Sequence, residues 1–493
     1  MTRIVTFPFL LALPIALLTA CGSDSSSSKK AENEFTYFAK PASETILSFN
    51  KTNNEIKEVV SKPKLLDLAD QYDSQGREIF GTMFYLKDQR WYQVSATTNA
   101  ASQVSSALIS NEVCDNEAFG SVGKAYLFYS TPGADNDCGK TADNRYWRID
   151  SSQTSSEAPL AIANAAVADN YDADAVVINN NLTGMVIRTG ERGDTLLYAN
   201  LDGETVQLKN GIDAPVHVFN FANHSSVILR IGSDLYDVTA TQLAAGELGE
   251  AFYTSSNSWT EAESLHSGTF VYADSAKLYH YDLASKTSTL VYNDNGADNS
   301  NPSADIRNID LGQNSAIVRT QFGALTRYKL VNFTSVSAPV VTELNLTIAN
   351  ASSTLYAVEG GFVSGGANTD KSRVASLISN AGKVTNIENA SWVNVGSPIN
   401  SENNLPVLLN YGETNNSLVA WSAAQSKPLH VLAQFDKSVE AVRLDPYTSK
   451  SGVALLSTLD TDGRNYGGIY SVNVLKSNSL KRIGNDTGFS VFH

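Results

Sequence analysis

The chain has 493 residues, with 36 Lys and Arg residues against 51 Asp and Glu residues, and a formal net charge of −15. Charged residues make up only 18% of the chain and aromatic residues 9%, which argues against a coiled coil, a long helical bundle and intrinsic disorder. Because no cluster of Lys and Arg follows residue 30, a nucleic-acid partner is not expected.

The N-terminus has the pattern of an export signal. The first 20 residues carry one charge, Arg3, and two prolines interrupt the uncharged stretch that follows it. This stretch is short for a membrane span of about 20 apolar residues, so residues 1–20 are predicted to be a signal peptide. Residues 18–21, Leu-Thr-Ala-Cys, resemble the lipobox of bacterial lipoproteins. The resemblance implies cleavage before Cys21 and its acylation; an ordinary secretory signal before a chance cysteine is the alternative.

Residues 21–34 continue as a polar, Ser-rich segment, which we interpret as a flexible tether between the lipidated Cys21 and a globular body. Acyl chains on one residue anchor a protein to a membrane because each buried CH₂ contributes roughly 0.8 kcal/mol. In lipoproteins an Asp directly after the lipidated cysteine tends to retain the protein in the inner membrane, and Gly22 stands there instead. The resemblance therefore favours a lipid anchor in the outer membrane, on the periplasmic or the external face.

Cysteine usage agrees with an exported chain. Only Cys114 and Cys138 follow Cys21, and an even pair in an oxidising compartment favours a disulfide. Closing a loop of about 25 residues would stabilise the fold by roughly 3.5 kcal/mol in the chain-entropy model. A metal site would need more Cys or His, and residues 100–150 contain no His. A redox site would need a Cys-x-x-Cys spacing, which is absent.

From residue 35 onward the chain alternates short segments of β-branched and aromatic residues with Gly, Asn, Asp and Ser turns, which is the pattern of strands and hairpins. The clearest example is residues 269–295, for which the pattern predicts three strands. Their turns are expected at residues 274–275 and 285–286. This arrangement is a β-meander.

The meander pattern recurs ten times, with a mean spacing of 47 residues. The copies are anchored on Leu47, Tyr92, Tyr146, Tyr198, Tyr236, Tyr279, Tyr328, Val374, Val419 and Tyr470. A period in the forties with about four short strands is typical of a β-propeller blade. Since propellers usually have four to eight blades, we expect one all-β ring of seven or eight blades over residues 35–493. The extra copies would be additional hairpins or a second ring, and a β-sandwich or a β-solenoid is the alternative fold.

Residues 278–283, Leu-Tyr-His-Tyr-Asp-Leu, followed by a turn and a return strand, resemble the loose repeat of bacterial periplasmic propellers of the TolB and quinoprotein types. The resemblance spans most of residues 35–485, although each copy is weak. Quinoprotein repeats carry a docking Trp in nearly every blade, and the five Trp residues here stand in unmatched places. A quinone cofactor is therefore not expected.

Two loops rich in Asp and Asn are candidate calcium sites, because hard cations prefer several oxygen ligands. Their candidate ligands are Asp135, Asp137 and Asp143 in the first loop, and Asp460, Asp462 and Asn465 in the second. Neither loop has the bidentate Glu of an EF-hand at position 12. The alternative is that these residues only form turns.

No known catalytic motif occurs in the sequence. The six His residues contain no pair at i and i+4, and Gly-x-Ser-x-Gly is absent. His280, between two tyrosines, is interpreted as a packed or surface imidazole. These absences favour a non-enzymatic binding or scaffold module with an envelope protein or a glycan as partner. A hydrolase or lyase acting on polysaccharide remains the alternative.

Overall fold

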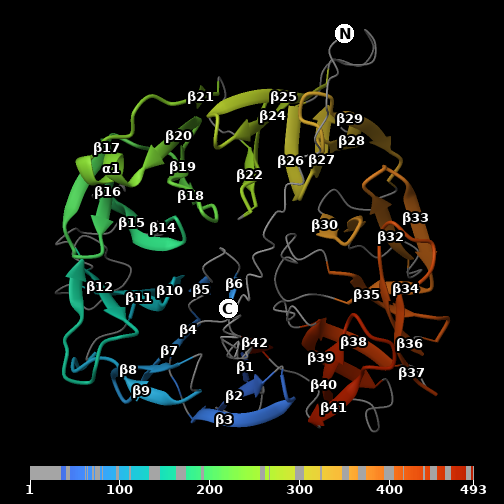
Figure 1. Cartoon of the computed structure of the whole chain (residues 1–493), viewed down its shortest axis with the longest axis horizontal. Helices are drawn as coiled ribbons and strands as arrows, with labels where there is room; N and C mark the ends of the chain where they lie inside the picture. Colours follow the sequence, from blue (N-terminus) through green and yellow to red (C-terminus); the bar gives the residue numbers. More distant parts are fainter. Residues whose placement is uncertain are drawn as a thin grey trace, which may run out of the picture.

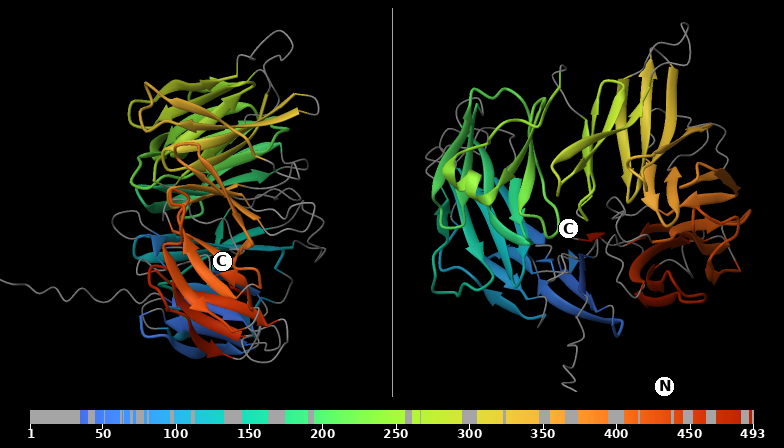
Figure 2. Two further views of the ribbon diagram at one scale, coloured as in Figure 1. Left: turned by 90° about the vertical axis from the view of Figure 1, so that its right-hand side faces the viewer. Right: turned by 45° about the horizontal axis from the view of Figure 1, so that its top comes forward.

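The computed structural model of the chain describes most of the body that the repeats predict. The described residues are 35–491 except 40–44, 51, 62, 64, 69–70, 73–77, 80–81, 96–98, 110–112, 133–144, 163–173, 190–193, 256–260, 266, 295–304, 323–324, 347–354, 365–373, 394–404, 415, 437–438, 445–451, 461–467 and 485–489. Their strands form ten four-stranded antiparallel sheets, which stand as blades around a central axis (Figure 1). Figure 2 shows the same ring from the side and in an oblique view.

The first five blades contain the following strands, each blade given from its innermost to its outermost strand. Blade 1 is β42 (Ser490–Val491), β1 (Phe35–Ala39), β2 (Thr45–Asn50) and β3 (Glu55–Ser61); blade 2 is β4 (Leu65–Leu68), β7 (Met83–Lys87), β8 (Arg90–Val94) and β9 (Ala101–Gln103). Blade 3 is β10 (Asp115–Ser121), β11 (Lys124–Thr131), β12 (Arg145–Asp150) and β13 (Leu160–Ile162); blade 4 is β14 (Asp174–Ile178), β15 (Asn181–Thr189), β16 (Thr195–Asn200) and β17 (Thr205–Asn210). Blade 5 is β18 (Val216–Phe219), β19 (Ser226–Ile231), β20 (Asp234–Thr239) and β21 (Tyr253–Thr254).

The other five blades follow in the same order. Blade 6 is β22 (Ala262–Ser264), β23 (Phe270–Asp274), β24 (Lys277–Asp282) and β25 (Thr287–Asn293); blade 7 is β26 (Asp305–Gly312), β27 (Ser315–Phe322), β28 (Leu325–Asn332) and β29 (Val340–Leu344). Blade 8 is β30 (Leu355–Val358), β31 (Gly361–Ser364), β32 (Val374–Ser379) and β33 (Val384–Glu388); blade 9 is β34 (Ala390–Trp392), β35 (Val407–Tyr411), β36 (Ser417–Trp421) and β37 (His430–Gln434). Blade 10 is β38 (Val439–Leu444), β39 (Val453–Asp460), β40 (Gly468–Asn473) and β41 (Lys481–Gly484).

Two small elements lie outside the four-stranded sheets. Strands β5 (Gln71–Tyr72) and β6 (Glu78–Ile79) pair with each other between β4 and β7. Helix α1 (Ala240–Ala245) follows β20, where Thr239 forms a capping box with Gln242. Within the described part of the chain, no helix is long and apolar enough to cross a membrane.

The predicted meander of residues 269–295 is confirmed. Strands β23, β24 and β25 cover it, and the two turns lie where the pattern places them. Ser275 and Lys286 have positive φ angles of 52° and 54° in these turns. A left-handed residue lets the chain reverse tightly between antiparallel strands.

The ring is closed by pairing between its two ends. Strand β42 is antiparallel to β1, with Phe38 opposite Val491 and Ala39 opposite Ser490. Blade 1 therefore contains three strands from the start of the described chain and one from its end. This pairing gives β1 a neighbour on both sides, so that its backbone hydrogen-bonding groups are paired.

The core is divided among the junctions between blades. Ten hydrophobic clusters occupy the ten junctions in turn, one between each pair of neighbouring blades. At the junction of blades 10 and 1, Phe38 and Phe49 pack against Leu455 and Ile469. Alternate residues along each strand face opposite neighbours, so a single blade buries both its faces only within the ring.

The β-propeller fold is confirmed, but the expectation of seven or eight blades is wrong, because the structure has ten. Each of the ten repeat anchors lies on the third strand of a different blade, from Leu47 on β2 to Tyr470 on β40. None of the copies is an additional hairpin or part of a second ring. Additional blades reduce the angle between neighbours, and the apolar side chains of both blades still fill each junction.

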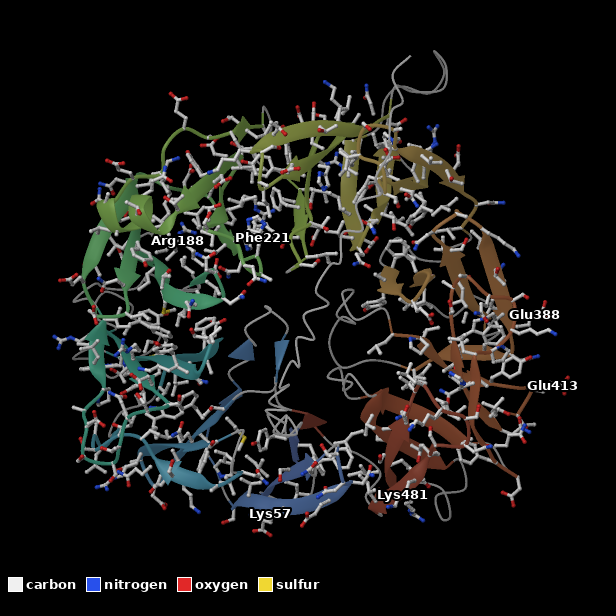
Figure 3. All side chains as sticks on the ribbon, viewed as in Figure 1. Lys57, Arg188, Phe221, Glu388, Glu413 and Lys481 are labelled. Atoms are coloured by element: carbon white, nitrogen blue, oxygen red, sulfur yellow. The ribbon has the colours of Figure 1, made fainter. Side chains whose placement is uncertain are left out.

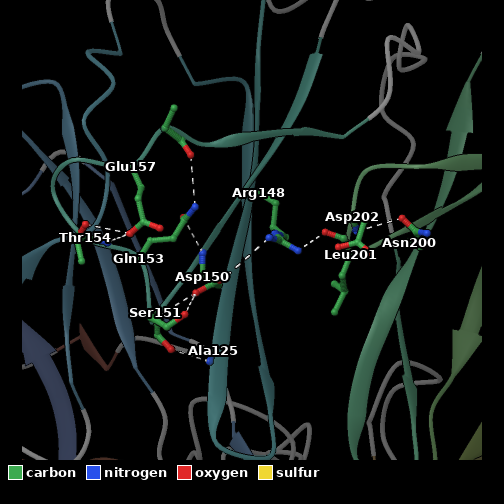
Figure 4. Close-up of polar contacts among 12 residues, drawn as sticks. Ala125, Arg148, Asp150, Ser151, Gln153, Thr154, Glu157, Asn200, Leu201 and Asp202 are labelled. Carbon is green, nitrogen blue, oxygen red and sulfur yellow. Dashed lines mark hydrogen bonds and ion pairs between the residues drawn. The ribbon is translucent and has the colours of Figure 1, made fainter.

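Polar contacts repeat across successive junctions. In four successive junctions, from that of blades 10 and 1 to that of blades 3 and 4, the third strand of one blade is hydrogen-bonded to a turn of the next blade. In each case it is the turn that follows the third strand of that next blade. The contacts are Ser471 Oγ to Asn54 Oδ1 (2.5 Å), Asn99 Nδ2 to Ser48 Oγ (2.7 Å), Gln93 Nε2 to Ser151 O (2.7 Å) and Arg148 Nη1 to Leu201 O. Figure 4 shows Arg148 between Asp150 of its own strand and Leu201 of blade 4.

The two ends of the ring differ in which connections they carry. Phe35, the first residue of β1, lies opposite Asn50, which directly precedes the turn between the third and fourth strands of blade 1. The chain therefore enters the ring at the end that carries the turns joining strands one to two and three to four. We call this end the N-terminal face and the opposite end the distal face.

Candidate functional site

The innermost strands surround the axis of the ring and carry a set of ionisable side chains. Among innermost-strand residues whose side chains the structure describes, the exposed ones are Glu117 on β10, His217 on β18, Glu263 on β22 and Arg307 on β26. We call these four residues the channel wall. They come from blades 3, 5, 6 and 7, so no single repeat contains the site.

Strand alternation explains why these exposed residues lie beside buried ones. Ala262 is buried in the junction of blades 5 and 6, and the next residue, Glu263, is exposed. Likewise Ile306 is buried between blades 6 and 7, whereas the side chain of Arg307 is 57% exposed and pairs with Asp305 at 3.3 Å. The wall thus presents charged groups directly beside apolar junctions.

Glu263 has an unusual electrostatic environment. Although the residue as a whole is exposed, surrounding protein removes part of the water from its carboxyl group and, together with the charges of Glu261 and Asp310, raises its pKa to about 7. The nearby guanidinium of Arg230 acts in the opposite direction. Near neutral pH, Glu263 therefore exists in both protonation states.

Asp310 is the second perturbed carboxyl group, one blade further round the ring on β26. Burial raises its pKa to about 6, while hydrogen bonds from Asn308 and from the backbone of Leu355, together with the charge of Arg319, lower it. Leu355 begins β30 of blade 8, so Asp310 also connects two neighbouring innermost strands.

Arg230 supplies positive charge behind this part of the wall. It lies on β19, is only 6% exposed and has its guanidinium 5.9 Å from the ring centre of Phe219. Burial lowers its pKa, and the carboxylates of Glu261 and Glu263 counter that effect. The arrangement of carboxyl and guanidinium groups suits a polar ligand that forms charged and neutral hydrogen bonds.

The periphery of the ring contrasts with the wall. Figure 3 shows Lys57, Glu388, Glu413 and Lys481 at the outer margin of the blades and Phe221 nearer the channel. His280 lies away from the wall on β24, where its ring contacts Phe333 at 5.6 Å and burial lowers its pKa. His280 is therefore half-buried, and its ring packs against Phe333.

The predicted calcium ligands mostly lie outside the described residues. Asp460 is the last residue of β39, while Asp135, Asp137, Asp143, Asp462 and Asn465 are not described. In the part of the chain that the structure describes, no group of three or more His, Cys, Asp or Glu residues is arranged to hold a metal ion. The calcium sites therefore stay predictions.

The predicted covalent modifications also stay predictions. Cys21 and the rest of residues 1–34 lie outside the described residues, as does Cys138. Cys114 lies directly before β10, and its backbone amide donates a hydrogen bond to Ser130 O at 3.0 Å.

Sequence reasoning missed the channel wall. His217 lies 19 residues before its repeat anchor Tyr236, whereas Glu263 lies 16 residues before Tyr279, so the repeat spacing does not align them. No local motif distinguishes these residues from the other ionisable residues of the chain, and their place on innermost strands comes from the fold.

Comparisons with known proteins add little beyond the fold. No family model matches the chain, and no curated protein matches it. It is similar to a solved eukaryotic initiation factor (TM-score 0.44, 12% identity, covering 82% of this chain and 96% of that one). It is also similar to apo AztD from Citrobacter koseri (TM-score 0.35, 9% identity, 82% and 95% covered) and to the dihydro-heme d1 dehydrogenase NirN (TM-score 0.36, 10% identity, 94% and 74% covered).

The sheet topology defines the chain as an all-β propeller protein. It is a ten-bladed propeller, and such a scaffold is consistent with a binding or scaffold module. Fold alone does not determine function, which has to be argued from the site.

Proposed function

We propose that this protein is a lipid-anchored β-propeller of the bacterial outer membrane that binds a protein or a glycan through its channel wall. The observation that carries the proposal is the wall itself, where Glu117, His217, Glu263 and Arg307 are exposed on the innermost strands of four blades. Exposed ionisable groups of both signs provide oriented hydrogen bonds to a polar partner. The lipobox and the tether of residues 21–34 support attachment to the membrane.

The test uses the full-length chain, purified in detergent, against a panel of envelope polysaccharides and a detergent extract of the outer membrane. A double variant, Glu263→Gln with His217→Gln, removes charge from the wall while keeping side-chain size. Glu388→Gln is the matched control, since Glu388 is exposed on an outermost strand. We expect the wall variant to weaken binding at least tenfold and the control to leave it unchanged. Equal binding by all three proteins would refute the proposed site.

A second candidate function is cleavage of a polysaccharide by hydrolysis or elimination. Glu263 and Asp310 support it, because carboxyl groups whose pKa values are raised toward neutrality serve as general acids. The full-length protein would then turn over one of the polysaccharides, and Glu263→Gln would reduce the rate at least a hundredfold. Absence of turnover, with and without added calcium, would reject this candidate and leave the binding function.

A further inference from the structure

The N-terminal face is the end of the ring from which a membrane tether would leave. β1 begins at Phe35, beside the turn that follows Asn50. The 14 residues from 21 to 34 precede it. An anchor at Cys21 would therefore hold this face, and not the distal face, toward the lipid.

The turns of blades 8, 9 and 10 form one continuous part of the N-terminal face, next to blade 1. Ser422 Oγ of blade 9 donates to Glu359 O of blade 8 at 3.2 Å, and the amide of Asn478 in blade 10 donates to Val431 O of blade 9 at 2.9 Å. Blade 10 is joined in turn to blade 1 by the Ser471 to Asn54 contact. These bonds hold the turns side by side, adjacent to the start of β1.

The turns between third and fourth strands in this region are basic, whereas the turn between the first two strands of blade 8 carries the half-buried Glu359. Four exposed lysines lie in these turns or directly after them: Lys383, Lys427, Lys476 and Lys481. These turns, residues 380–383, 422–429 and 474–480, contain no Asp or Glu. None of the four lysines forms an ion pair with a described residue. Leu475, beside Lys476, is 44% exposed.

The corresponding turns of blades 3 to 5 have the opposite character. They carry the exposed acidic residues Glu157, Asp202, Glu247 and Glu250 and no Lys or Arg. The N-terminal face is therefore divided into a basic sector over blades 8 to 10 and an acidic sector over blades 3 to 5. Only the basic sector is attractive to an anionic surface.

We propose that the basic sector rests on the anionic headgroups of the membrane that holds the acyl anchor, so that the distal face points away from the lipid. This inference depends on the lipid anchor of the proposed function. The occupant is a lipid surface because the start of β1, four lysines and an exposed leucine lie on one side of the ring. Each lysine near an anionic surface strengthens binding to that surface by about fivefold, and the contributions of several lysines add as free energies.

The test places a photoreactive benzoylphenylalanine on opposite ends of one blade in the full-length lipidated chain. Ser426 lies in the basic sector of blade 9, and Thr414 lies at the distal face of the same blade; both are exposed. Each protein is reconstituted into vesicles of phosphatidylethanolamine and phosphatidylglycerol, irradiated and examined for crosslinked lipid. Ser477, in the neighbouring turn of blade 10, provides a second basic-sector position in case the first variant does not fold.

We expect at least fivefold more lipid crosslinking from position 426 than from position 414. Replacing the four lysines with Gln is expected to reduce that ratio severalfold, whereas Lys277→Gln, at the distal face, is expected to leave it unchanged. If the chain floats with the vesicles but crosslinks lipid equally at both positions, or more from position 414, the inference is overturned. If the wild type floats no better than Cys21→Ser, the anchor is absent and the proposed function fails as well.

Discussion

Phe38 lies directly opposite Val491 in one antiparallel pair, although 453 residues separate them along the chain. This contact joins the last described strand to the first blade and makes the ten blades one ring. Closure matters for function because it brings the innermost strands of distant blades around a common channel. The ionisable wall exists only in the closed ring.

Phe38 is expected to contribute strongly to stability. It is 0% exposed at the junction of blades 10 and 1. Phe38→Ala leaves a cavity there, for which we expect a loss of about 3–5 kcal/mol in the free energy of unfolding. Urea denaturation measures it. Val340→Ala, at a position 63% exposed, should change the same quantity by less than about 0.5 kcal/mol. Similar losses in both variants would contradict the closure described.

The junction of blades 5 and 6 contains a polar contact that can be tested separately. The hydroxyl of Tyr281 donates to Asp237 at 2.8 Å, and Lys286 Nζ lies 3.0 Å from the other carboxylate oxygen. Tyr281→Phe is expected to cost about 1.5–3 kcal/mol, the usual range for a hydrogen bond to a charged group. Tyr279→Phe, on the same strand, should cost much less. Thermal unfolding of both variants compares them, and equal costs would argue against the Asp237 contact.

Stability should depend on pH through Glu263. Its pKa is raised from 4.5 to about 7 in the fold, so folding favours the protonated group. This contribution is complete below about pH 4.5 and is lost as the pH rises through 7. Glu263→Gln, which is always neutral, should therefore be more stable than the wild type at pH 8 and similar to it near pH 4. Glu388→Gln should show no such difference. A variant less stable than the wild type at pH 8 would contradict the shift.

Counting free thiols before and after reduction tests the predicted disulfide. If Cys114 and Cys138 are bonded and Cys21 carries the anchor, maleimide should label no thiol in the unfolded protein before reduction and two after reduction. Mass spectrometry of peptides from residues 114–138 shows which cysteines carry the maleimide label. Labelling of either cysteine before reduction would disprove the bond. If the bond is present, Cys138→Ser should destabilise the protein by up to about 3.5 kcal/mol.

Most of the architecture could be predicted from the sequence because local signals repeat. Strand alternation and turn residues are short-range features, and every anchor from Leu47 to Tyr470 proved to lie on a third strand. The number of blades does not follow from the repeats alone, because propellers usually have four to eight blades and a repeat copy can also be an additional hairpin. Each copy can bury its faces only against two neighbours, so ten copies form ten blades.

The channel wall could not be predicted in the same way. Glu263 and Asp310 lie on different blades, and the proximity of Glu263 to Asp310 and to Arg230 arises from the packing of blades 5 to 7. The raised pKa values depend on burial and on neighbouring charges, neither of which the local sequence contains. The division of the N-terminal face into basic and acidic sectors has the same origin, since it depends on which turns lie side by side.

The most direct test of the central claim, that the channel wall binds a partner, is photocrosslinking in intact cells. Benzoylphenylalanine replaces His217 on the wall in one strain and Glu388 on the outer margin in another, with the full-length chain in both. The account predicts a discrete adduct of an envelope protein or glycan from position 217. Glu263→Gln is expected to reduce the amount of this adduct, and the same adduct is not expected from position 388. Adducts from position 388 together with none from position 217 would contradict it.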